Sequence, residues 1–141
     1  MASALTLELA VDKIESAYEF MLAYAAQGRD FESGGGDGPP IRGTLNDLKL
    51  ALSTLAPAFG SAIAAVDASR REALGTFCRL LAADAERALA ALGVVLSAPN
   101  ISSQLIDNLN ASMHLRTLLT DMFLLDEALS PASQSAPRAT R

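Results

Sequence analysis

The chain has 141 residues, half of them apolar and 5% aromatic, with a formal net charge of −5. Its length suits one domain, and a core filled mainly by Leu and Ala favours helices over sheets. Two lysines and one adjacent arginine pair are too few for a nucleic-acid surface, a single cysteine cannot form an internal disulfide, and no run reaches the roughly 18 apolar residues of a membrane span.

The first predicted helix covers residues 4–27, where apolar side chains recur at spacings of three and four. Glu8 and Asp12 interrupt the apolar residues near its start, so this stretch is not a signal peptide, and we expect a cytoplasmic protein. Phe20 interrupts the polar face and is a possible partner contact. The predicted buried positions are Leu7, Val11, Ile14, Tyr18, Met21 and Ala25.

Residues 28–43 combine several glycines with two adjacent prolines and predict a loop. A phosphate-binding P-loop requires a preceding strand and a following Lys-Ser or Lys-Thr, and both are missing. We therefore interpret the segment as a linker. It is long for a helix connection, so it either crosses from one end of a bundle towards the other or carries a partner contact.

The next helix is predicted over residues 44–67, because its apolar rhythm persists through Pro57. Proline lacks the N–H that a helix uses, so we expect one kinked helix, with two helices meeting at Ala56 as the alternative. The predicted buried positions are Leu45, Leu48, Leu52, Leu55, Phe59, Ala62, Ile63 and Val66.

Ser69 and Glu72 have the spacing of a capping box, which predicts a turn near residues 67–69 and then a third helix. A continuous helix through this junction is the alternative. Cys78 lies on the heptad seam of the third helix, where burial raises a thiol pKa, so it is interpreted as structural. The seam consists of Leu74, Cys78, Leu81, Ala85, Ala88, Leu92 and Val95.

Residues 102–129 give the longest helical pattern, with Ser102 or Ser103 as the N-cap. The pattern carries two separate apolar arcs, although a bundle helix buries one. The second arc predicts a homodimer interface or a partner surface, with a break near His114 that turns the second half inward as the alternative. This arc consists of Leu115, Leu118, Leu119, Met122, Leu125 and Leu129.

His114 shares one stripe of this helix with Asp121, and both are possible partner contacts. Zinc sites require several His or Cys ligands, and the carboxylate pairs have no partner histidine, so we assign no metal, cofactor or catalytic residue.

We predict an all-α, up-down four-helix bundle over residues 1–129, with a disordered tail over residues 130–141. By elimination, the function is protein–protein interaction by an adaptor, assembly factor or regulator. A helical export chaperone or a coat for hydrophobic surfaces is the second hypothesis, and an enzyme is the third.

Overall fold

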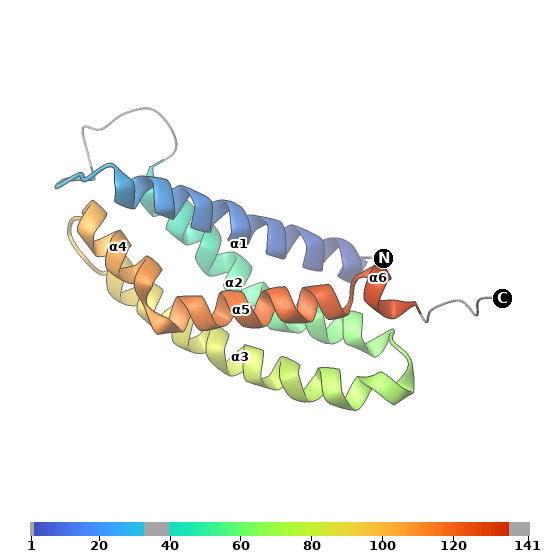
Figure 1. Ribbon diagram of the computed structural model, residues 1–141. Helices are drawn as coiled ribbons and strands as arrows, with labels where there is room; N and C mark the ends of the chain where they lie inside the picture. The colour runs from blue at the N-terminus through green and yellow to red at the C-terminus, as the bar shows by residue number, and fades with distance from the viewer. Residues whose placement is uncertain (1, 33–39, 136–141) are drawn as a thin grey trace.

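The computed structural model describes residues 2–32 and 40–135, and all regular structure in these ranges is helical (Figure 1). The all-α prediction is therefore confirmed. Five helices form the body, and a sixth of four residues follows them. They are α1 (Ala2–Ala26), α2 (Ile41–Ala64), α3 (Ala68–Leu96), α4 (Ser103–Ala111), α5 (Met113–Ala128) and α6 (Pro131–Gln134).

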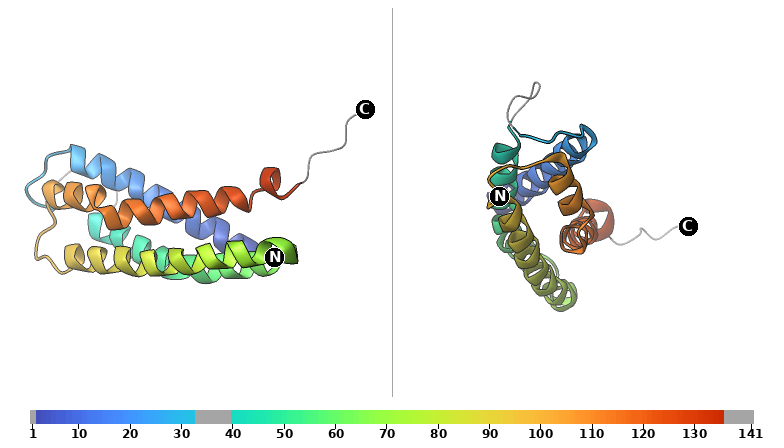
Figure 2. Two further views of the ribbon diagram at one scale, coloured as in Figure 1. Left: turned by 60° about the horizontal axis from the view of Figure 1, so that its bottom comes forward. Right: turned by 90° about the vertical axis from the view of Figure 1, so that its left-hand side faces the viewer.

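Consecutive long helices pack against each other, α1 against α2 and α2 against α3. The last part of the chain divides between two neighbours, because α4 packs mainly against α1 whereas α5 packs against α3. The left-hand view of Figure 2 shows α4 and α5 following one another along the length of α3. Together they cover the side of the core that one long helix was predicted to cover.

The core contains most of the side chains selected by the three-four spacing. Phe59 and Leu81 are completely buried, while Tyr18 and Cys78 are only partly buried. Burying one such Leu or Phe side chain contributes roughly 1.5–3 kcal/mol, so periodicity identified the main stabilising contacts. The core also includes alanines and one aromatic residue that the pattern did not select, namely Ala10, Ala17, Ala51 and Tyr24.

The second and third helices are separate, as predicted, and α2 continues through Pro57 as one helix. Their first residues differ from the prediction. α2 begins at Ile41 after the extended Pro40, three residues before Thr44. α3 begins at Ala68 with Asp67 as N-cap, so Ser69 lies inside the helix and the predicted capping box does not start it.

The prediction of one helix over residues 102–129 is wrong, because Ser112 interrupts it. Ser112 has an extended backbone (φ −65°, ψ 141°), and its Oγ accepts a hydrogen bond from the backbone N–H of Leu115 at 3.3 Å. It therefore ends α4 and caps α5. Ser102 caps α4 in the same way, as predicted.

The break at Ser112 turns the predicted interface arc into the core of the single chain. Leu118 and Met122 are completely buried, and Leu129 is partly buried. This is the arrangement given as the alternative, so the arc no longer argues for a dimer. Leu115, Leu119 and Leu125 are buried with them. The apolar residues left on the surface of α5 are Met113, Phe123 and Leu124.

At one end of the molecule, an ion pair between Glu32 and Arg42 connects the chain after α1 to the start of α2. The Nε–Oε2 and Nη2–Oε1 distances are 2.7 and 2.9 Å. Arg42 also donates to the carbonyl oxygens of Leu96 and Ala98, at 3.1 and 2.6 Å. Glu32 accepts from the backbone N–H of Ile101 at 2.8 Å. The start of α2, the end of α3 and the chain after α1 thus meet at one charged pair.

A second set of hydrogen bonds at this end joins α1 to the start of α4. The Tyr24 hydroxyl donates to the Ile101 carbonyl at 2.6 Å, and Ser103 Oγ donates to the Tyr24 carbonyl at 2.6 Å. Arg29 donates its backbone N–H to Ser103 Oγ at 2.7 Å. The predicted linker is therefore held by hydrogen bonds over residues 29–32, and residues 41–43 are helical. Residues 33–39 lie outside the described ranges.

The predicted disordered tail begins with one helical turn, α6. The guanidinium of Arg70 holds it by donating to the Ala128 carbonyl at 3.2 Å and to the Gln134 side chain. The tail prediction for residues 136–141 falls outside the described ranges.

We predict that Leu118→Glu unfolds the single chain, because Leu118 is completely buried and an unpaired buried charge costs more than about 4 kcal/mol. Circular dichroism and thermal melting measure the effect. Leu124→Glu is the matched control, since Leu124 is exposed on the same helix. A folded Leu118→Glu monomer would contradict the burial of this arc.

We predict that Glu32→Gln lowers the melting temperature at pH 7, since the carboxylate binds Arg42. The hydrogen bonds from Arg42 hold the pKa of Glu32 below its usual 4.5. This contribution is complete above pH 4.5 and disappears as the pH falls through the lowered pKa. The gap between variant and wild type should therefore close in acid. Glu72→Gln, at an exposed position, serves as control, and an equal gap at pH 3 and pH 7 would exclude the ion pair as the cause.

Candidate functional site

A groove of about 510 Å³ lies between the C-terminal half of α3 and α4, and we call it the α3/α4 groove. Its walls are almost entirely apolar. It ends at the break between α4 and α5, where Ser112 and His114 line it. The apolar lining consists of Ala90, Ala91, Val94, Val95, Leu105 and Leu109.

The groove exists because α4 is held on α1 more closely than on α3. Asn110 donates a hydrogen bond from its side chain to the Met21 carbonyl of α1 at 3.1 Å. Ser103, at the start of α4, is bonded to Tyr24 of the same helix. The side of α4 that faces α3 meets the short side chains of Ala90 and Ala91, so the space between the two helices is left open.

Two exposed apolar side chains mark this region of the surface. Val94 lines the groove and is 67% exposed. Met113, the residue between Ser112 and His114, is 72% exposed. These two side chains add apolar surface in the groove lining and next to it.

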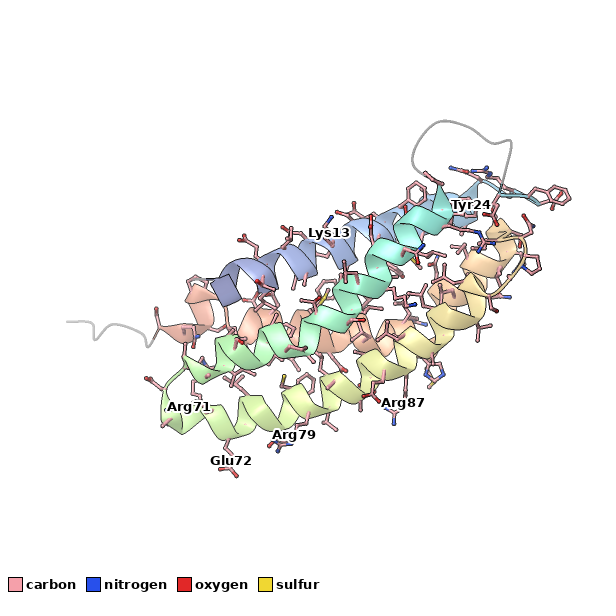
Figure 3. All side chains as sticks on the ribbon, turned by 180° about the vertical axis from the view of Figure 1, so that it is seen from behind. Lys13, Tyr24, Arg71, Glu72, Arg79 and Arg87 are labelled. Carbon is pink, nitrogen blue, oxygen red and sulfur yellow. The ribbon has the colours of Figure 1, made fainter. Side chains whose placement is uncertain are left out.

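The groove lining contains one charged side chain, Arg87, and one other ionisable side chain, His114. No carboxylate belongs to the lining. Arg87 Nη1 donates to Asp84 Oδ1 at 2.9 Å, one turn earlier on α3. Figure 3 shows Arg79 and Arg87 at separate points along α3. In a chain with a net charge of −5, this groove is therefore an exception to the general charge.

A pair of carboxyls, one buried and one half-buried, lies next to Arg87. Asp121 of α5 is only 8% exposed and faces Asp84 of α3. Burial and then the neighbouring Asp84 raise the pKa of Asp121 to about 7. Its Oδ2 atom has no partner among the described residues, although one proton shared between the two carboxyls would supply a hydrogen bond.

The predicted partner contacts are scattered. His114 is exposed and lines the groove. Phe20 is partly buried in a different hollow between α1 and α2, where its ring stacks near Tyr24 with centroids 6.4 Å apart. The prediction of Asp121 as a surface contact is wrong, because the break at Ser112 turns this residue towards α3.

Cys78 is partly buried, and burial raises the pKa of its thiol, as predicted from its place on the seam. Its Sγ donates to the Ala56 carbonyl at 3.7 Å. A thiol in this environment is protonated at neutral pH and is a poor nucleophile.

A second hollow, of about 620 Å³, lies between α1 and α5 and is strongly acidic. Burial and repulsion between carboxylates raise the pKa values of Glu15 and Asp126. No histidine or cysteine lines this hollow. Over residues 2–32 and 40–135, no three His, Cys, Asp or Glu side chains are grouped so that they could hold a metal ion. The carboxylates that line this acidic hollow are Glu8, Asp12, Glu15, Asp126 and Glu127.

Comparison with models of known protein families, with curated proteins and with solved structures finds no match to this chain. None of the helices in the described ranges is long and apolar enough to cross a membrane.

We predict that Asp121→Asn stabilises the protein by about 4 °C in melting temperature at pH 8, because the amide removes a buried charge and can donate to Asp84. The raised pKa means that the folded state favours protonated Asp121. Wild-type stability should therefore decrease as the pH rises from about 4 to about 7 and then level off.

The advantage of Asp121→Asn should accordingly vanish near pH 4. Asp107→Asn removes the same charge from an exposed position and is the control. A variant that is less stable than wild type at pH 8 would show that the Asp121 carboxylate stabilises the fold.

Proposed function

We propose that this protein acts by binding another protein, and that the α3/α4 groove is its binding site. The observation that carries the proposal is an open apolar groove beside two exposed apolar residues, Val94 and Met113. We further propose that the scaffold is an up-down four-helix bundle with a bend in α2 at Pro57, in which α4 and α5 together act as the fourth helix.

The shape of the groove favours a helix as the occupant. It follows the direction of α3 from Arg87 to Val95, which is about 12 Å of helix at 1.5 Å per residue. Two large side chains one turn apart on a partner helix would fit that length. Amphipathic helices use such anchors, at spacings of three, four and seven residues, when they dock in grooves.

Self-association remains a separate prediction. Two copies meeting groove to groove would bring Arg87 of one copy near Arg87 of the other, and like charges disfavour that contact. A homodimer would have to use other exposed apolar residues, such as Phe123 and Leu124. The export-chaperone and coat hypotheses need a broader apolar surface than this groove provides.

We predict that a photo-crosslinking amino acid at Val94 gives one discrete adduct in the native cell, whereas the same group at Leu80 does not. Leu80 is the matched control, because it is exposed on the same helix outside the groove. Mass spectrometry of the adduct should locate the bond on a helical segment of the partner. Ala90→Glu, at an exposed position in the groove lining, should abolish the adduct, and an adduct that survives this change would exclude the groove.

A further inference from the structure

We propose that the α3/α4 groove binds a partner helix that carries a carboxylate on its flank, and that Arg87 couples this binding to a proton shared by Asp84 and Asp121. The inference rests on the proposed function, since it specifies the partner and the regulation of the same groove.

The first step concerns the charge of the partner. Two ionisable side chains line the groove, Arg87 and His114, and neither can carry a negative charge. The remaining lining is apolar apart from Asn108 and Ser112. A helix with Lys or Arg beside its apolar face would meet like charge at Arg87, whereas Asp or Glu could form a charge-assisted hydrogen bond with it.

The second step concerns how Arg87 is held in the free protein. Its Nη1 atom binds Asp84 at 2.9 Å, but its side chain remains 60% exposed. An exposed ion pair of this kind contributes little to stability. Arg87 can therefore exchange Asp84 for a carboxylate of the partner at small cost.

The third step concerns the carboxyl pair next to Arg87, in which Asp84 is half-buried and Asp121 is buried. Asp84 contacts Asp121, which has one unpaired oxygen and almost no exposed surface. Two adjacent carboxyls retain one proton because they cannot both ionise without repulsion. Arg87 Nη1 is bonded to Asp84, so a cation lies beside the pair in the free protein.

α3 carries the further charged side chains Arg70, Arg71, Glu72, Arg79 and Glu86, and none of them is among the groups that shift the pKa of Asp121. Asp84 is the charged group that acts on Asp121. The helices α4 and α6 also contact α5, but α6 has no charged residue and α4 has only an exposed aspartate. Besides Asp121, α5 carries the ionisable side chains His114, Arg116, Asp126 and Glu127. The aspartate of α4 is Asp107.

The direction of the coupling follows from this geometry. When a partner carboxylate draws Arg87 away from Asp84, the carboxyl pair loses its nearby cation and holds its proton more tightly. Binding then takes up protons in the range where the free pair would lose its own, near pH 7. Affinity should therefore decrease as the pH rises, by about twofold to fivefold between pH 6 and pH 8.

The experiment uses displayed helical peptides as the probe. A library with a fixed Leu stripe and randomised flanking positions is selected against the full-length protein, and peptides whose binding is lost with Val94→Glu but kept with Leu80→Glu are retained. We expect Asp or Glu to be enriched beside the stripe. Arg87→Gln should weaken these peptides about fivefold, while Arg79→Gln, an exposed arginine on the same helix, should not.

The proton link is measured by titration calorimetry at pH 6 and pH 8, with His114 replaced by Gln in every protein so that the imidazole cannot contribute. Affinity should fall with pH in the Asp121 protein and stay constant in Asp121→Asn. Proton uptake, measured in buffers of different ionisation enthalpy, should disappear with the same change.

The outcomes separate the two proposals. If no peptide depends on Val94, the groove is not a binding site and the proposed function fails. If Val94-dependent peptides are found but carry basic flanks, or if their affinity has the same pH dependence with and without Asp121, the groove stands and the coupling is overturned.

Discussion

The interruption of the last long helix at Ser112 is the constraint on which the rest of the structure depends. A single serine with an extended backbone lets α4 follow α1 and α5 follow α3. One straight helix could not bury the apolar arcs of both halves, because the arcs point in different directions. The capping hydrogen bond from Leu115 to Ser112 makes the break inexpensive, since it satisfies a donor that the interruption would otherwise leave free.

The same break gives α3 two different neighbours. Along its second half it meets α4 loosely, across the apolar groove, and nearer its middle it meets α5 closely, with Asp84 against Asp121. Arg87 lies between these regions and has a role in both. The buried carboxyl of Asp121, with its raised pKa, thus lies close to an exposed ion pair at the edge of the groove. Such perturbed groups are more frequent at functional sites than in cores, which is why the proposal includes this pair.

The sequence predicts the all-α class and most of the core because helical periodicity directly reports which side chains are buried. The burial of Leu81 and Phe59 was predicted from this periodicity alone. The break could not be found in this way, since Ala111 and Ser112 are compatible with a helix and only the direction of the two apolar arcs indicated a change. The Asp84–Asp121 pair and the groove depend on the distance between helices, which periodicity does not contain. One signal was available in the sequence. Asp84 directly precedes the seam residue Ala85, so its carboxyl is expected near the edge of the buried face of α3.

The ion pair between Glu32 and Arg42 has a consequence for how this chain tolerates change in length. These two residues hold both ends of the segment 33–39 together through bonds to the rest of the molecule. For a flexible connection between two fixed residues, the free energy of closure grows only with the logarithm of the length, by about 0.6 kcal/mol for each doubling. Because Glu32 and Arg42 are both fixed, an insertion between them would leave α1 and α2 in register.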